Sequence, residues 1–258
     1  MDLTQGYHQA PLTFATRASQ HSSTFVSRLR SIFERFRLHN LFLKASKCKF
    51  GYSELDFVGK VIPEEGLQMS RTRIQSVLDF PVPVYARFIG TVNYFRDFIR
   101  NQSSLVHLLH ALIADYHKIR KIQWTTEALE AHEDIKLQVS KSTIMYFMSD
   151  KAPITLHTDA SDYGVGGYLF QTVDGVNQPI ASVSKLMTSA QLQWSVIRME
   201  AYGIYYSCMY LESLLRDHPF TIRTDHRNLL FIEHSSNRMI VRWCMALSEF
   251  TFNIRVLR

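Results

Sequence analysis

The sequence predicts an α/β fold with a mixed sheet for the C-terminal part of the chain, and a mostly helical α+β region before it. Two observations lead to this prediction. After a boundary near Ser149–Pro153, three apolar, β-rich runs follow one another, and a long helical stretch then alternates with further strands. Before that boundary, apolar residues recur at spacings near three and four, as in amphipathic helices. The expected elements of the C-terminal part are strands at 153–160, 165–173, 178–184, 219–225 and 250–257, a helix at about 189–215, and short helices across 227–249.

The N-terminal region is predicted to consist of helices interrupted by one small hairpin. Residues 24–43 place Phe25, Leu29 and Phe36 on one stripe and arginines on the other face, which indicates an amphipathic helix. Residues 48–67 alternate short β-rich runs with Gly and a Pro-Glu-Glu-Gly turn, which indicates a hairpin. Further helices are expected at 71–80, 86–100, 103–115 and 126–140.

Composition argues against several classes of protein. Of the 258 residues, 46% are hydrophobic and only 10 are Gly and 7 Pro, which favours globular domains over a fibrous or disordered chain. No apolar run approaches the ~20 residues that a membrane span needs, and the N-terminus lacks the features of a signal peptide. The three cysteines form no Cys-x-x-Cys pair, which argues against a zinc site and favours an intracellular protein, cytoplasmic or nuclear.

Positive charge is concentrated near the N-terminus. Residues 17–49 contain eight Lys or Arg and the single acid Glu34, whereas residues 151–258 contain ten Lys or Arg and nine Asp or Glu. A basic segment beside a nearly neutral domain suggests a polyanionic partner such as nucleic acid. The alternative is a solvated basic helix face, and charge alone leaves both open. The candidate nucleic-acid-binding residues are Arg28, Arg30, Arg35, Arg37, Lys44, Lys47 and Lys49.

Three acidic residues stand where the apolar pattern predicts burial. Asp159 lies near the end of the first strand of the C-terminal part, and Asp225 lies at the end of the strand that follows the long helix. Glu200 lies at the edge of the apolar face of that helix, a face that includes Ile197. All three acids are therefore expected on elements that pack together.

Two interpretations of these acids compete. Buried carboxylates lose hydration and repel one another, which destabilises the fold unless cations compensate. In one interpretation each acid is satisfied separately, by capping a loop or helix or by reaching solvent. In the other, the acids are oxygen ligands for a hard cation, Mg²⁺ above all. Two such ions about 4 Å apart can activate water and stabilise the leaving oxygen during phosphodiester cleavage.

Three motifs carry a resemblance to a known family. Residues 158–166 read T-D-A-S-x-x-G-x-G, residues 194–202 read W-S-x-x-x-x-E-A-Y, and residues 220–229 read F-T-x-R-T-D-H-x-N-L. Together they resemble the ribonuclease H (RNase H) domain of gypsy-type LTR retrotransposon polyproteins. Upstream segments resemble parts of the same reverse transcriptase. Residues 2–12 resemble a palm segment, 44–50 and 57–62 resemble the end of the palm and the primer-grip hairpin, and 88–99 resemble the thumb and connection.

The resemblance implies a site and a chemistry. Asp159, Glu200 and Asp225 would be the catalytic, metal-binding carboxylates, with Asp159 bridging two ions. Mg²⁺, or else Mn²⁺, would be the cofactor, and the RNA strand of an RNA–DNA hybrid would be the substrate. The remainder of a retroelement polyprotein would be a further partner, and no membrane partner is expected. His226 follows the motif but is interpreted as structural.

Two departures from the family pattern change what is expected. No Tyr-x-Asp-Asp turn is present, so polymerase activity is expected to be lost, with most of the palm and fingers missing. The chain also stops before the family's fourth metal-binding carboxylate, so the RNase H-like domain is expected to be truncated. The alternative function is a catalytically inactive remnant that binds nucleic acid. The expected domains are a palm remnant and basic helix at 1–50, a primer-grip hairpin, thumb and connection at 51–150, and an RNase H-like domain at 151–258.

Overall fold

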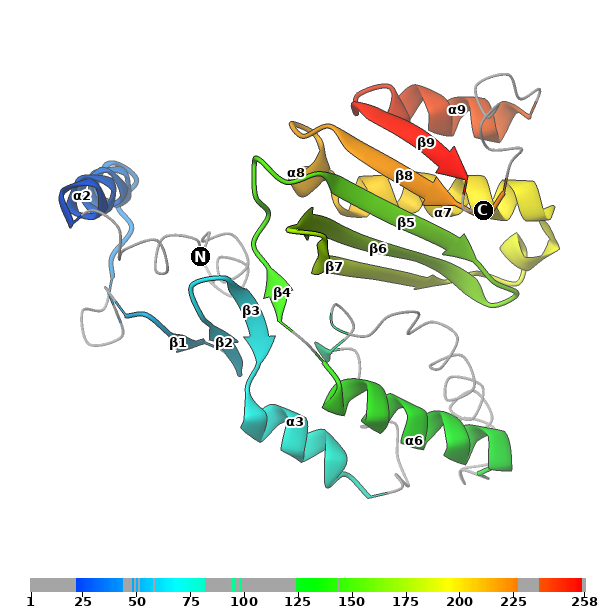
Figure 1. The fold of residues 1–258 in the computed structure, drawn as a ribbon, viewed down its shortest axis with the longest axis horizontal. Helices are drawn as coiled ribbons and strands as arrows, with labels where there is room; N and C mark the ends of the chain where they lie inside the picture. Colours follow the sequence, from blue (N-terminus) through cyan, green and yellow to red (C-terminus); the bar gives the residue numbers. More distant parts are fainter. Residues whose placement is uncertain are drawn as a thin grey trace. The chain divides into compact units, whose positions relative to one another are not determined.

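The fold is that of a computed structural model, and it divides into two compact units, Met1–Ser70 and Arg71–Arg258 (Figure 1). Each unit is considered by itself. The helix predicted at 103–115 lies outside the described residues, and the three domains expected from the sequence stay a prediction. The structure describes residues 22–43, 48, 50, 52–57, 59–81, 94–95, 98, 124–142, 144–226 and 237–256.

In unit one, helix α2 (Ser22–Leu38) is the amphipathic helix that the sequence predicts, but it ends five residues early. Asn40 adopts a left-handed conformation, with φ of 51°. The N–H of Leu41 then donates to the carbonyl of Phe36 at 2.8 Å, and the N–H of Asn40 to that of Arg37 at 3.3 Å. These two bonds form a Schellman motif, which closes a helix by satisfying its last carbonyls.

The predicted hairpin of unit one is a meander of three short strands. β1 (Leu55–Phe57) pairs antiparallel with β2 (Lys60–Ile62), and β2 pairs antiparallel with β3 (Gly66–Met69). Gly59, with φ of 74°, lies in the turn between β1 and β2, a conformation that Gly adopts without strain.

The first part of unit two contains helices α3 (Arg71–Leu78) and α6 (Thr126–Ser140), which contact each other, and the short strand β4 (Met145–Tyr146). The helix predicted at 126–140 is confirmed. It begins there because the side chain of Thr125 accepts a hydrogen bond from the N–H of Ala128 at 3.3 Å, as an N-cap residue does. Its buried face consists of Ala128, Ala131, His132, Ile135 and Val139.

A five-stranded mixed sheet forms the centre of the rest of unit two (Figure 1). Its strands are β5 (Ile154–Ala160), β6 (Gly164–Val173), β7 (Val176–Leu186), β8 (Phe220–Thr224) and β9 (Phe252–Val256). Their order is β7-β6-β5-β8-β9. The first three are antiparallel neighbours, whereas β8 runs parallel to both β5 and β9. The mixed sheet predicted from the sequence is therefore confirmed.

The backbone conformation of a two-residue turn sets how β6 and β7 pair in their long hairpin. This turn is Asp174-Gly175, with φ of 51° and 77°. A type I′ turn requires positive φ at both central residues, and it matches the twist of the flanking strands.

One long helix was predicted at about 189–215, and this prediction was wrong in detail. The segment contains a 3₁₀ turn (Gln191–Gln193), helix α7 (Val196–Tyr210) and helix α8 (Glu212–Leu215). Because the backbone of Ser195 is extended, α7 begins only at Val196. Ile197 therefore lies in the first turn and is 40% exposed, not part of the core as expected.

Helix α7 packs against one face of the sheet, with α9 (Arg238–Leu247) beside it (Figure 1). A side chain at Gly167 on β6 would lie 2.5 Å from the hydroxyl of Ser207 on α7, so only glycine permits this approach. The fully buried residues between helix and sheet include Leu156, Leu169, Ile204, Cys208 and Ile222. This core fixes α7 against the strands that carry the acidic residues. Within the described parts of the chain, no helix is long and apolar enough to cross a membrane.

Candidate active site

The parallel pairing of β5 and β8 brings Asp159 and Asp225 to one edge of the sheet. His157 pairs with Arg223 across these strands. Asp159 lies two residues further along β5, and Asp225 directly follows the last residue of β8, so both lie at the C-terminal ends of these strands. Both face solvent, and the Asp225 side chain is 59% exposed.

Glu200 reaches the same edge from α7. One turn after it, Gly203 lies so close to β5 that an added Cβ would be 3.7 Å from the backbone oxygen of Asp159. The backbone N–H of Ala160 donates a hydrogen bond to the Glu200 carboxylate. Glu200 is only 2% exposed. The first turns of α7 thus place a buried carboxylate beside the end of β5.

The tightest group of possible metal ligands at this edge is Glu200, Asp225 and His226. One ligand atom from each lies within 4.8 Å of the others. Nδ1 of His226 lies 3.0 Å from Oδ1 of Asp225 and 3.7 Å from Oε1 of Glu200. Asp159 is not in this group, although its charge acts on both Glu200 and His226. The structure therefore joins two of the three predicted acids most closely and adds a histidine.

The environment of Glu200 disfavours its charged form. Burial raises the pKa of Glu200 to about 7, and the negative charges of Asp225 and Asp159 contribute to this rise. The charge of His226 and the hydrogen bond from Ala160 act in the opposite direction. Oε2 of Glu200 is buried and has no hydrogen-bond partner in the structure. Among the described residues, the charge of His226 and the Ala160 hydrogen bond offset the effect of burial on Glu200 only in part.

His226 is the cationic group that the site does contain. Its hydrogen bond with Asp225 is the largest cause that raises its pKa, and the charges of Glu200, Asp225 and Asp159 add to this effect. The imidazole is one-third exposed, so it can exchange its proton with solvent. Either ring nitrogen could instead bind a metal ion when neutral.

Of the three predicted acids, Glu200 is buried, whereas Asp159 and Asp225 are exposed. Asp159 and Asp225 stand at strand ends, where the alternation that buries apolar neighbours also turns these carboxylates to solvent. Only Glu200 carries a large desolvation cost. The interpretation of His226 as purely structural missed a residue of the cluster. Its position directly after an acid at a strand end was the signal available in the sequence.

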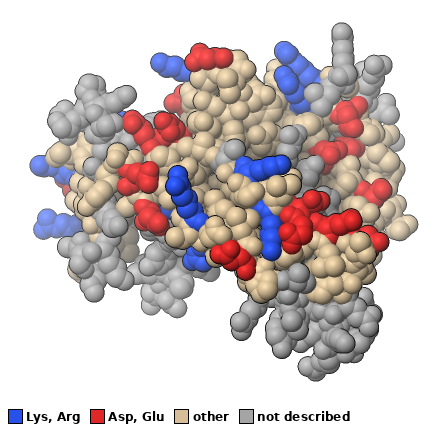
Figure 2. Space-filling model, turned by 60° about the horizontal axis from the view of Figure 1, so that its bottom comes forward, with Lys and Arg blue, Asp and Glu red and all other residues tan. Residues whose placement is uncertain are grey.

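The basic residues proposed to bind nucleic acid lie in unit one or outside the described residues. Arg28, Arg30, Arg35 and Arg37 are all exposed on α2. On the face of the molecule drawn in Figure 2, the described Lys and Arg side chains lie among Asp and Glu side chains. That these arginines bind nucleic acid stays a prediction. Lys44, Lys47 and Lys49 lie outside the described residues.

Sheet order, the covering helix α7 and the acidic edge define the class of this domain as RNase H-like. Comparison with known families agrees, because residues 149–250 match the RNase H-like domain found in reverse transcriptase. Residues 149–250 therefore belong to this domain family, and the sequence relatives identify the chain as a reverse transcriptase and RNase H fragment of a retroelement.

The sequence relatives of this chain are much longer proteins. The transposon Tf2-3 and Tf2-4 polyproteins of Schizosaccharomyces pombe are each 33% identical to it over 249 residues. The matches cover 92% of this chain but only 18% of each polyprotein, so the chain spans about a fifth of these relatives.

Solved structures show the same fold at low sequence identity. A foamy viral protease-reverse transcriptase dRH in complex with double-stranded DNA matches with a TM-score of 0.69 and 16% identity, covering 93% of this chain and 44% of that one. A foamy viral protease-reverse transcriptase in complex with an RNA/DNA hybrid matches with a TM-score of 0.65 and 18% identity, covering 89% and 33%.

Proposed function

We propose that this chain hydrolyses the RNA strand of RNA–DNA hybrids with the help of divalent cations bound at the acidic edge of the sheet. The observation that carries the proposal is the state of Glu200. This carboxylate is 2% exposed, has an unpartnered oxygen, and lies beside Asp225. A bound cation would stabilise the ionised carboxylates at this edge, since it would neutralise charge that no described group there fully neutralises.

The donor atoms suit a hard divalent cation. Carboxylate oxygens are the protein ligands that Mg²⁺ prefers, and a few of them suffice when substrate phosphate completes the coordination. Glu200 and Asp225 would bind the ion, His226 could add a nitrogen ligand, and Asp159 would contribute charge from the same edge. Mg²⁺ is the proposed cofactor, with Mn²⁺ as the alternative. When bound, such an ion lowers the pKa of water and stabilises the leaving oxygen.

The residues of the chain would also prepare the site before any ion binds. Packing of α7 on the sheet fixes the backbone around Glu200, and the N–H of Ala160 orients its carboxylate. His226 holds Asp225 through its hydrogen bond. Pre-positioned groups of this kind need little rearrangement during the reaction, which is how an active site stabilises a transition state.

The proposed substrate draws support from the relatives. Foamy viral protease-reverse transcriptases with the same fold have been solved in complex with double-stranded DNA and with an RNA/DNA hybrid. The chain itself is basic, with a formal net charge of +6, which favours a polyanionic partner. We propose no DNA synthesis by this chain, since it contains no Tyr-x-Asp-Asp motif.

Cleavage of a labelled hybrid tests the proposed activity. The full chain is incubated with a hybrid whose RNA strand carries a fluorophore, with Mg²⁺, Mn²⁺ or EDTA. We expect cleavage that requires a divalent cation and that falls strongly in Glu200→Gln and in Asp225→Asn. Glu212→Gln, at the other end of the domain, is the matched control and should cleave normally. Equal cleavage by wild type and both site variants would rule out this activity.

The second candidate function is binding without cleavage. Four exposed arginines on α2, against the single acid Glu34, favour it. Electrostatic binding to phosphates weakens steeply as salt concentration rises. Hybrid affinity that falls steeply with salt, together with no cleavage under any cation condition, would establish this function in place of the first.

A further inference from the structure

The face of the sheet that turns away from α7 carries an unusual row of side chains. Gly167 and Leu156 point toward α7, since a side chain at Gly167 would meet Ser207 of that helix and Leu156 beside it. Side chains alternate between the two faces along a strand. His157, next to Leu156, therefore belongs to the opposite face.

The strand pairings place residues of three further strands level with His157 on the same face of the sheet. Tyr168 on β6 pairs with His157 on β5. His157 also pairs with Arg223 on β8, and Arg223 pairs with Arg255 on β9. Neighbouring strands lie about 4.8 Å apart, so these four residues form one row across the sheet. We call Tyr168, His157, Arg223 and Arg255 the arginine row.

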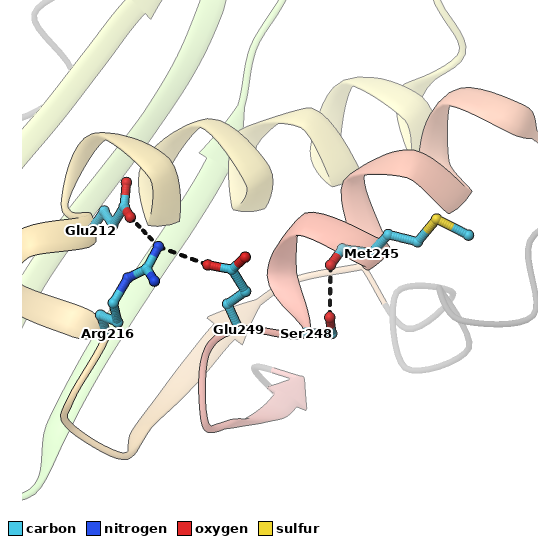
Figure 3. A network of polar contacts seen from close by, with 5 residues as sticks. All are labelled: Glu212, Arg216, Met245, Ser248 and Glu249. Atoms are coloured by element: carbon cyan, nitrogen blue, oxygen red, sulfur yellow. Dashed lines mark hydrogen bonds and ion pairs between the residues drawn. The ribbon is translucent and has the colours of Figure 1, made fainter.

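The two arginines of the row have no acidic partner. Arg223 and Arg255 are exposed, and neither forms an ion pair with any acid in the described parts of the chain. Like charges directly opposite each other on one sheet face destabilise the pairing. Arg216, in the same domain, is instead held between Glu212 and Glu249 (Figure 3). The row therefore presents two adjacent positive charges that no described acid neutralises, so an external anion can bind there.

The position of the row identifies this anion. Asp159 follows His157 by two residues on β5, which is about 6.6 Å along the strand. Asp225 follows Arg223 by two residues and lies directly after the end of β8. A nucleic-acid strand with its cleaved phosphate at the acidic edge can therefore extend its neighbouring phosphate over the arginines. Guanidinium groups bind phosphate oxygens in paired hydrogen bonds. The half-buried ring of Tyr168 adds an aromatic surface of the kind on which bases stack.

We propose that the arginine row binds the phosphodiester backbone of the substrate strand beside the bond that is cleaved. This inference rests on the proposed function, because it takes the acidic edge as the point of cleavage. An acidic protein segment could also contact Arg223 and Arg255, but nothing would draw it on toward Asp159 and Asp225. A nucleic-acid strand must reach these acids in order to be cleaved, so the position of the row favours nucleic acid.

Hybrid binding by the full chain tests the proposal. Fluorescence anisotropy with a labelled RNA–DNA hybrid is measured in EDTA, so that no cleavage occurs, at several salt concentrations. The variant in which Arg223→Gln and Arg255→Gln are combined should bind roughly tenfold more weakly. Its plot of log affinity against log salt should be shallower by about two units, one for each lost phosphate contact. Replacing both arginines by lysine should restore most of the slope, because charge is retained.

A matched control and a second ligand separate the outcomes. Arg216→Gln removes the same charge from a paired arginine and should leave affinity and slope unchanged. Melting temperature of the double glutamine variant should not fall, since a repulsion is removed. Unchanged hybrid binding by that variant, or binding of poly-glutamate at the row in place of hybrid, would overturn the proposal. A wild type that binds hybrid through the row yet never cleaves it would leave this inference standing and refute only the proposed activity.

Discussion

Acidic side chains at the two ends of the same α/β domain are in opposite electrostatic environments. At one end, the guanidinium of Arg216 contacts both Glu212 at the start of α8 and Glu249 just after α9 (Figure 3). These groups are all well exposed, and the two carboxylates raise the pKa of Arg216. At the other end, Glu200 is buried next to Asp225, and the pKa of Glu200 rises to about 7.

The two ends differ in whether a permanently charged side chain of the protein neutralises the acids. Two acids share one permanently charged arginine at the start of β8, so nothing further is needed there. At the end of β8, the described cationic group that acts on Glu200 beside Asp159 and Asp225 is His226, whose charge depends on pH. The acids at one end are neutralised by an arginine, whereas the acids at the other end remain available to bind another cation. This contrast supports a divalent cation more strongly than the presence of acids alone, because exposed acids are common.

Replacing the acids at each end should give the largest difference between them. Glu200→Gln and Asp225→Asn each remove a proposed metal ligand, and we expect cleavage of hybrid to fall by at least about a hundredfold. Glu212→Gln and Glu249→Gln remove the same charge at the other end and should change cleavage by less than about twofold. Initial rates under saturating Mg²⁺ measure the effect. Similar losses at both ends would mean that the acidic edge has no special role.

The pH dependence of stability should give the second largest difference between the two ends. The folded-state pKa of Glu200, about 7, is above its ordinary value of 4.5. Its contribution to stability is therefore fully present below pH 4.5 and is lost as pH rises through about 7. The loss is on the order of 2 kcal/mol once solvent screening is allowed for. The raised pKa of His226 adds to the loss in the same direction.

Thermal melts without divalent cations, from pH 5 to pH 8, measure this loss. Wild type should become less stable across the range, and Glu200→Gln should decline less because glutamine does not ionise. Mg²⁺ or Mn²⁺ at pH 8 should restore wild type, since a ligand that binds only the folded state stabilises it. A Glu200→Gln decline as steep as that of wild type would show that Glu200 does not cause the loss.

Metal selectivity should reveal what His226 contributes. Imidazole is a good ligand for transition metals, whereas Mg²⁺ prefers oxygen. We expect His226→Asn to weaken Mn²⁺ binding by about tenfold and Mg²⁺ binding by less. Electron paramagnetic resonance of free Mn²⁺, with Mg²⁺ as competitor, measures both affinities. His218→Asn, at the exposed contact of His218 with Asp150, is the matched control. Equal weakening of both metals would show that His226 only orients Asp225.

The strands of the domain could be predicted because their signals are local. β5, β6 and β7 alternate or run apolar over seven or more residues, and the Asp174-Gly175 turn permits only one tight hairpin. Helix ends were harder to predict. α2 ends at Leu38 because Asn40 adopts a left-handed conformation, which Asn allows but does not require. α7 begins late because Ser195 is extended.

The site could be predicted only in part, because it depends on contacts between distant segments. The positions of Asp159 and Asp225 at strand ends followed from the pattern, but their exposure did not. Burial of Glu200 depends on how closely α7 approaches the sheet, which Gly167 on β6 permits and the helix pattern does not show. The side-chain contact of His226 with two acids depends on tertiary geometry in the same way.

The smallest effect is expected at the arginine end, where the comparison can be tested from the other side. Exposed ion pairs gain little, because both partners are well hydrated when separated and screened when together. Arg216→Gln should therefore leave the melting temperature nearly unchanged at every pH from 5 to 8, and high salt should not alter wild type noticeably. A fall in the melting temperature of Arg216→Gln as large as the pH-dependent fall assigned to Glu200 would mean that Arg216 holds α8 against the end of α9. In that case both ends of the domain would depend on electrostatics equally, and the state of Glu200 would no longer single out the acidic edge as a cation site.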